Sequence, residues 1–289
     1  MESTIRLAER RYRPLKIFIG GIAGSGKTIG SLKLALGIAG DLKDVCVIDS
    51  ENNSSNLYAH LGKYSVLPIS EFSPQSYIAA IKKVEDAGFK VCIIDSMSHE
   101  WSGPGGSLEI VDRVTKASRS GNSYMAWGEV TPQHQAFLTA IIQTPMHVIG
   151  TFRQKDEYVI ETNERGKSVP KKIGLKNITR EGTDYEPDLL FSIHGNHFVS
   201  VEKDRTMLFD GKPPFMLDAS VGVMLKSWSL GEIDSDTPET ITARIMSLLP
   251  EIKDKELKDK IELSLSEHQR NQPMLIVIEK RITDILKTK

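Results

Sequence analysis

Cysteine is scarce in this sequence of 289 residues, which contains only Cys46 and Cys92. Two cysteines cannot build a disulfide framework, and both lie inside apolar runs, so we expect buried small hydrophobic side chains. Charge of one sign is not in excess either, because 37 lysines and arginines face 38 aspartates and glutamates. The net charge of −1 excludes a globally cationic protein that wraps nucleic acid.

Long apolar runs are also absent. No stretch approaches the ~20 apolar residues that a membrane-spanning helix needs. Residues 1–14 have no apolar core and include Glu2 and Glu9, unlike a secretion signal or a transit peptide. We therefore expect a soluble, cytoplasmic protein with no membrane partner. The hydrophobic residues make up 39% of the chain, a share that supports an ordinary globular core.

Short apolar runs alternate with segments of helical spacing. The runs predict buried strands at 15–20, 45–49, 91–95 and 147–152. The segments between them predict helices at 27–39, 73–87 and 132–143. Continuously apolar strands that alternate with helices indicate an α/β fold, in which helices cover a mostly parallel central sheet. Segments 189–193 and 197–202 alternate in polarity and predict β-hairpins at the sheet edge.

The composition changes after Gly231. Residues 232–240 read EIDSDTPET, an acidic stretch in which Thr237-Pro238 is a helix-initiating pair. The rest of the chain is rich in Glu, Lys, Leu and Ile, and predicts two or three helices. We therefore expect one large domain over residues 1–231 and a small helical region over residues 232–289.

Residues 21–28, GIAGSGKT, match the phosphate-binding pattern G-x-x-x-x-G-K-[ST] at every fixed position. A predicted strand precedes them and a predicted helix follows. Glycines let successive N–H groups turn toward a phosphate, and the helix N-terminus adds its positive end. We expect Lys27 to reach the β- and γ-phosphates of ATP or GTP, and Thr28 to bind Mg²⁺. The expected nucleotide-binding residues are Gly21, Ala23, Gly24, Ser25, Gly26, Lys27, Thr28 and Ile29.

Two further carboxylates follow predicted strands. Asp95 ends the apolar run VCIID and is expected to hold the Mg²⁺ shell. In many P-loop ATPases a glutamate follows this aspartate and orients water, but here the next residue is Ser96. Glu51, just beyond the run VCVID, would point into the same crevice and is our expected catalytic base. The alternatives are that Glu51 is a solvated strand-end acid, or that Glu100 is the base.

These segments resemble the RecA-like ATPases. The resemblance is carried by the loop at 21–28, IDSEN at 48–52, IIDSMSHEW at 93–101 and HVIGTFRQK at 147–155. It implies that Glu51 is the base, that Asp95 binds the metal, and that Arg153 or Gln154 senses the γ-phosphate. The recombinases carry Asn-Gln at the sensor, a pattern that this chain lacks. The chain is most similar to the short phage-type RecA-like ATPases of single-strand annealing and recombination, over roughly residues 15–215.

The resemblance also implies an oligomer. Segment 198–205, FVSVEKDR, ends in Lys203 and Arg205, where RecA-like proteins commonly insert a basic pair into the neighbouring subunit's ATP site. Such a pair would balance the negative charge of the transition state, and it implies a ring or filament with head-to-tail contacts. The alternative is a solvated hairpin tip.

Residues 165–180 contain six cations and no acid, and their glycines and proline predict a loop or an irregular hairpin. RecA-like proteins place a DNA-contacting loop after the sensor strand, so we expect salt-dependent binding of single-stranded DNA here. A solvated surface hairpin is the alternative, and for Trp101 and Trp127 core packing is the favoured reading over base stacking. The cations are Arg165, Lys167, Lys171, Lys172, Lys176 and Arg180.

Three functional hypotheses follow. The first is a DNA-stimulated, RecA-like ATPase that acts as an oligomer in recombination, annealing or repair, with ATP and Mg²⁺ as cofactors. The second is a nucleotide-dependent assembly or switch ATPase that grips a protein partner with its C-terminal helices. The third, disfavoured, is a small-molecule kinase, in which residues 165–180 would form a lid. No histidine or cysteine spacing predicts another metal.

Overall fold

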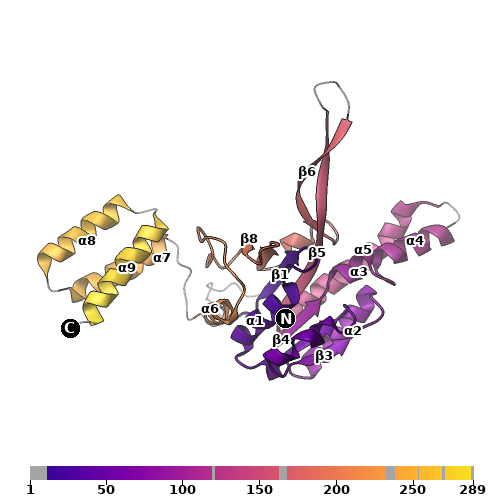
Figure 1. The fold of residues 1–289 in the computed structure, drawn as a ribbon, viewed down its shortest axis with the longest axis horizontal. Helices are drawn as coiled ribbons and strands as arrows, with labels where there is room; N and C mark the ends of the chain where they lie inside the picture. Colours follow the sequence, from indigo (N-terminus) through magenta and orange to yellow (C-terminus); the bar gives the residue numbers. More distant parts are fainter. Residues whose placement is uncertain are drawn as a thin grey trace, which may run out of the picture.

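A computed structural model describes residues 12–118, 121–162, 168–231, 238–252, 254–268 and 271–287. The strands in this part of the chain form one eight-stranded sheet in the order β3-β2-β4-β5-β1-β7-β8, with β6 paired to β5 (Figure 1). Their bounds are β1 (Lys16–Gly21), β2 (Val45–Asp49), β3 (Ser65–Pro68), β4 (Val91–Asp95), β5 (His147–Thr162), β6 (Ser168–Asn177), β7 (Leu189–Ile193) and β8 (Val199–Asp204).

The sheet is mostly parallel, as predicted. Strands β3, β2, β4, β5, β1 and β7 pair in parallel, whereas β8 pairs antiparallel with β7 and β6 antiparallel with β5. The predicted bounds of β2 and β4 are confirmed, and in each strand the four apolar residues and the terminal aspartate are all buried. The predicted edge hairpin is also confirmed, with β8 two residues later than expected.

Helices cover both faces of the sheet. On one face α1 (Lys27–Ala39) and α6 (Ala219–Ser229) pack around Leu34, Ile93 and Leu225. On the other face α2 (Pro74–Asp86) and α5 (Ser123–Gln143) pack around Tyr77 and Phe137. The other α-helices described around the sheet are α3 (Ser98–Ser102) and α4 (Ser107–Ala117). Short 3₁₀ helices are η1 (Leu42–Asp44), η2 (Ser54–Leu61) and η3 (Thr183–Tyr185).

Cys46 and Cys92 are buried free thiols in the core, as expected. Burial raises the pKa of Cys46 to about 11, so this thiol stays protonated and behaves as a small hydrophobe.

Helix α5 corrects one prediction. The sequence pattern places a helix start at Thr131-Pro132, but the helix begins at Ser123, where the Asn122 side chain accepts a hydrogen bond from the N–H of Tyr124. Pro132 lies inside the helix. A proline removes a hydrogen bond to the carbonyl four residues earlier, here that of Gly128. Gly128 and Pro132 are both exposed, so water can solvate the freed carbonyl.

Strand β5 is longer than predicted and forms an arm. Beyond Phe152 it leaves the core and pairs with β6 as a two-stranded hairpin arm, residues 154–162 and 168–177 (Figure 1). The ladder has a bulge next to Glu157 and Tyr158. Of the two readings for residues 165–180, a loop or an irregular hairpin, the described residues 168–177 match the second.

Beyond residue 237 the structure contains α7 (Pro238–Leu248), η4 (Leu249–Glu251), α8 (Lys255–Glu267) and α9 (Gln272–Lys287). These helices pack around a hydrophobic cluster of their own, which includes Ile245, Ile261 and Leu275. Among the helices in the described ranges, none combines the length and the apolar character that a membrane span requires.

The close approach of α1 to α6 gives the first prediction. A Cβ atom on Gly37 would lie 2.0 Å from the carbonyl oxygen of Ala219 and 2.8 Å from the Cα of Gly222. Because backbone atoms cannot give way as a flexible side chain can, we expect Gly37→Ala to lower the free energy of unfolding by about 1–3 kcal/mol. Thermal and urea unfolding measure the change.

Gly128→Ala is the matched control. A Cβ atom there meets nothing within 4 Å, so this variant should unfold at or above the wild-type midpoint, since alanine favours the helix by roughly 0.5–1 kcal/mol. Equal stability of Gly37→Ala and Gly128→Ala would contradict the close packing of α1 on α6.

Candidate active site

The loop between β1 and α1 is built for an anion. Gly24 and Gly26 have φ angles of 77° and 94°, in the left-handed region that glycine adopts without strain. Gly26 is also the N-cap residue of α1, so the helix start has no side-chain cap, and its first turn contains no acidic residue. The unpaired N–H groups and the positive end of the helix dipole therefore face the space above the loop.

A cavity of about 530 Å³ lies above this loop. It is formed at the carboxyl ends of parallel strands, which is where ligands bind in open α/β sheets. The cavity is lined by Ala23, Gly24, Gly26, Lys27, Thr28, Glu51, Ser54, Tyr58, Asp95, Arg153, Gln154 and Ile178. The structure thus gathers the loop with Asp95, Glu51, Arg153 and Gln154, all predicted from sequence.

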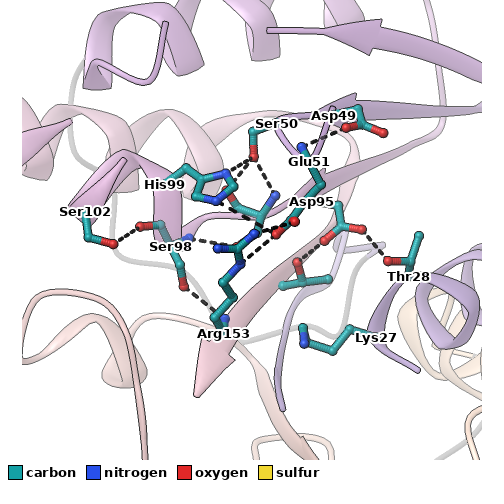
Figure 2. A network of polar contacts seen from close by, with 12 residues as sticks. Lys27, Thr28, Asp49, Ser50, Glu51, Asp95, Ser98, His99, Ser102 and Arg153 are labelled. Carbon is teal, nitrogen blue, oxygen red and sulfur yellow. Dashed lines mark hydrogen bonds and ion pairs between the residues drawn. The ribbon is translucent and has the colours of Figure 1, made fainter. Parts of the chain in front are cut away.

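Asp95 is the buried carboxylate of the cavity. It ends β4, and its Oδ2 accepts a hydrogen bond from Thr28 Oγ1 at 2.6 Å while Oδ1 accepts one from Thr151 Oγ1 (Figure 2). Burial raises the pKa of Asp95, and the two hydroxyl donors partly oppose that rise. Thr28 and Asp95 supply hydroxyl and carboxylate oxygens on one side of the cavity.

These oxygens suit Mg²⁺. Magnesium is bound in such sites by one or two protein oxygens, and phosphate oxygens and water complete its shell. A site of this kind does not need a cluster of several acidic or histidine ligands, and the described ranges contain no group of three or more such residues placed to hold a metal. Thr28 and Asp95 would therefore hold the ion together with the nucleotide's phosphates.

Lys27 lies along the phosphate loop. Its Nζ donates hydrogen bonds to the carbonyl oxygens of Gly21 and Ile22, both at 2.9 Å. Burial lowers the pKa of Lys27, and the negative charges of Asp95 and Glu51 oppose this. The ammonium group is thus held within the loop at the cavity wall.

Glu51 and Arg153 form an ion pair across the mouth of the cavity. Arg153 Nε donates to Glu51 Oε1 at 2.8 Å, and Arg153 Nη2 donates to Glu51 Oε2 (Figure 2). The hydrogen bonds to Glu51 are the main cause that raises the pKa of Arg153. The predicted base and the predicted sensor are therefore in direct contact, a relation that neither motif reveals by itself.

Asp49 and Glu100 have other roles. Asp49 is buried, and its carboxylate accepts hydrogen bonds from the N–H groups of Glu51, Asn53 and Ser55, so it holds the turn that carries Glu51. Glu100, the alternative base, is 1% exposed and contacts His134 and Ser107 instead of lining the cavity.

Gln154 lines the cavity next to Arg153. Its Nε2 donates to Ser192 Oγ at 3.1 Å, which fixes the amide at the end of β7. A Cβ atom on Gly20 would lie 2.5 Å from this Nε2, so the glycine in β1 leaves the space that Gln154 occupies. Both sensor candidates thus reach the cavity.

Lys203 and Arg205 lie elsewhere. They stand at the end of β8, and neither lines the cavity described above. Lys203 Nζ donates to the carbonyl of Tyr185, and Arg205 Nη1 lies 3.8 Å from Asp188 Oδ1 with half of its side chain exposed. Their role as a finger toward a second subunit stays a prediction.

The structure describes only part of the basic stretch at residues 165–180. Arg165 and Lys167 lie outside the described residues. The lysines of β6 pair with acidic residues: Lys171 with Glu161, Lys172 with Asp156, and Lys176 with Glu157 and Glu181.

Arg180 donates to Thr131 Oγ1 and lies over the ring of Trp127, which stacks on Trp101. The stack of Trp101 and Trp127 therefore packs within the protein. Tyr158 and Tyr185, which flank the basic stretch, are both more than half exposed.

Sequence reasoning missed Thr151 and His99. Thr151 lies within a predicted apolar strand, where a buried hydroxyl needs a partner, and this is the signal that could have pointed to Asp95. His99 follows Asp95 by four residues and contacts Ser50, whose hydroxyl also binds the backbone of Ser96. Only the parallel register, with Asp49 opposite Asp95, brings these residues together.

The comparisons with known proteins agree with this site. The model of a family described as AAA domain matches residues 13–215. The chain belongs to this AAA domain family. The match supports a P-loop ATPase and a nucleotide-binding site, and it ends before α6. No curated protein matches the chain.

Proposed function

We propose that this protein is a Mg²⁺-dependent ATPase that transfers the γ-phosphoryl group of ATP to water. The main support is that the loop with Lys27, together with Thr28, Asp95 and Glu51, lines one cavity at the carboxyl ends of parallel strands. The N–H groups of residues 24–28 and the Lys27 ammonium bind the phosphates. Thr28 and Asp95 hold Mg²⁺, which when bound neutralises charge on the phosphate oxygens.

Glu51 accepts the proton of the attacking water in this proposal. Arg153 occupies both of its carboxylate oxygens in the structure. These two hydrogen bonds use one lone pair on each oxygen and hold the carboxylate against the guanidinium, so in this proposal the pair opens before turnover. The γ-phosphate attracts the guanidinium strongly and is the natural competitor for Arg153, which makes Arg153 a sensor that releases the base on nucleotide binding.

The finer role that we propose is a RecA-like oligomer whose hydrolysis depends on assembly. Support comes from Arg205, whose side chain is 51% exposed just after β8 and does not line the cavity of its own chain. A cation in this position is available to a second subunit.

We also propose that single-stranded DNA stimulates the ATPase through the hairpin arm. Support comes from β5, which carries Arg153 and Gln154 at the cavity and continues into the arm. Since the β6 lysines are paired with carboxylates, a phosphate backbone must displace those acids, and binding should be strongly salt-dependent. Because these ion pairs leave fewer free cations for DNA, they also favour the second candidate. That candidate is a nucleotide-dependent assembly ATPase that binds a protein partner through α7, α8 and α9.

Replacing the base tests the hydrolysis. We expect Glu51→Gln to bind ATP as the wild type does and to lose about 10²- to 10⁴-fold in turnover, because an amide cannot accept the proton. Calorimetric ATP binding and phosphate release measure the two effects, and Lys27→Ala is the control that should lose ATP binding itself. Normal hydrolysis by Glu51→Gln would rule out the assignment of the base.

A mixing experiment tests the shared site. We expect Arg205→Ala to lose most turnover, while equimolar mixtures with Glu51→Gln regain some, because a mixed interface contains one intact base and one intact finger. Asp188 stays paired with Arg13 at 2.8 Å, so the substitution should not unfold the protein. Exposed Lys212 supplies the control variant, Lys212→Ala. An Arg205→Ala protein with wild-type turnover would exclude the finger.

The arm offers a charge test for DNA. We expect Lys171→Gln to weaken binding of single-stranded DNA and to reduce the salt slope by about 1, as for the loss of one phosphate contact. Glu161→Gln should strengthen binding, because it frees Lys171 from its ion pair. Fluorescence anisotropy and ATPase rates at two salt concentrations measure both. DNA-independent ATPase, with no binding by any of the three proteins, would favour the assembly hypothesis.

A further inference from the structure

His99 lies beside the proposed base. It stands on α3, four residues after Asp95, and its ring packs against Phe72 with a centroid distance of 5.0 Å. Its side chain is 14% exposed. Figure 2 shows the imidazole between Ser50 and the ion pair of Glu51 with Arg153.

The hydrogen bonds of Ser50 favour one tautomer of this imidazole. Ser50 Oγ accepts a hydrogen bond from the N–H of Ser96 at 2.8 Å, so its own proton is free to be donated. His99 Nδ1 lies 2.9 Å away, whereas the Ser96 carbonyl is at 3.2 Å and already accepts from the Tyr77 hydroxyl. Donation from the Ser50 hydroxyl to Nδ1 places the ring proton on Nε2.

The ring is neutral as well as oriented. Burial lowers the pKa of His99, and the positive charge of Arg153 lowers it further. Nε2 faces Glu51 Oε1 at 3.9 Å, beyond hydrogen-bond distance, while the same oxygen accepts from Arg153 Nε at 2.8 Å. His99 is thus a neutral N–H donor placed next to a carboxylate that another group now holds.

We propose that His99 is the positioning residue of Glu51: when Arg153 leaves for the γ-phosphate, the Nε2–H group of His99 takes over Oε1 and orients the carboxylate. This inference rests on the proposed ATPase function. A free carboxylate would rotate, whereas one neutral hydrogen bond fixes it and leaves Oε2 open to water.

The proposed hydrolysis step involves water, the γ-phosphate of ATP and Glu51. The water oxygen forms a bond to the γ-phosphorus, and the bond from that phosphorus to the β,γ-bridging oxygen breaks, with its electron pair passing to ADP. The proton of the water passes to Glu51 Oε2. His99 keeps its own proton throughout, so its effect is on the orientation of the base.

Two substitutions of His99 by amide side chains distinguish a positioning role from a purely structural one. The amide nitrogen of glutamine can occupy the position of Nε2, whereas asparagine reaches only the position of Nδ1. We expect His99→Asn to lower kcat about 10- to 100-fold, the range for loss of an orienting partner, with the Kd of ATP and the unfolding midpoint unchanged. His99→Gln should recover most of the rate.

The outcomes are distinct. Wild-type kcat in His99→Asn, or an equal loss in both variants at equal stability and ATP affinity, overturns the role of His99. If the wild type itself does not hydrolyse ATP, or if Glu51→Gln does so normally, the proposed function fails and this inference fails with it. A second measurement does not depend on variant folding: ¹⁵N NMR of the wild type should show the Nε2–H tautomer of His99, and an Nδ1–H tautomer overturns the proposal.

Discussion

A carboxylate buried at the end of a central strand is the constraint on which the site depends. Asp95 can stay in the interior only with hydrogen-bond donors at both oxygens, and it finds them on two different elements, Thr28 in α1 and Thr151 in β5. Meeting that requirement fixes the loop at residues 21–28, β4 and β5 relative to one another. The parallel register of β2 and β4 then places the Asp49 turn, and with it Glu51, at the same edge.

Much of this arrangement could be predicted from sequence. Runs such as Val45–Asp49 have four apolar residues and then a carboxylate, so they indicate both a strand buried on two faces and the edge at which its acid appears. The loop from Gly21 to Thr28 specifies its own backbone through its glycines, and this information is local. For that reason the placement of Lys27, Thr28, Asp95 and Glu51 around one cavity followed from motifs and topology alone.

The features that sequence could not supply are set by contacts between distant residues. Residues 153–162 read RQKDEYVIET, five polar residues and then three apolar ones, which is no strand alternation. Only the pairing with 168–177 makes this segment a strand. Lys171 and Lys172 look like free cations in the sequence, but on the neighbouring strand Glu161 and Asp156 form ion pairs with them. The start of α5 depends on Asn122 and on solvent at Gly128, which outweigh the proline signal. His99 has no partner nearby in the sequence, because Ser50 and Glu51 follow β2 and only the fold brings them to α3.

One feature of β5 has a mechanical consequence. This strand runs without interruption from His147, in the middle of the sheet, through Arg153 to Thr162 in the arm (Figure 1). It pairs with β4 over residues 147–150 and with β1 over residues 148–153, so this part of β5 is fixed in the sheet. Arg153 therefore lies at the junction between the fixed part of β5 and the hairpin arm, so a displacement of the arm would change the position of its guanidinium relative to Glu51.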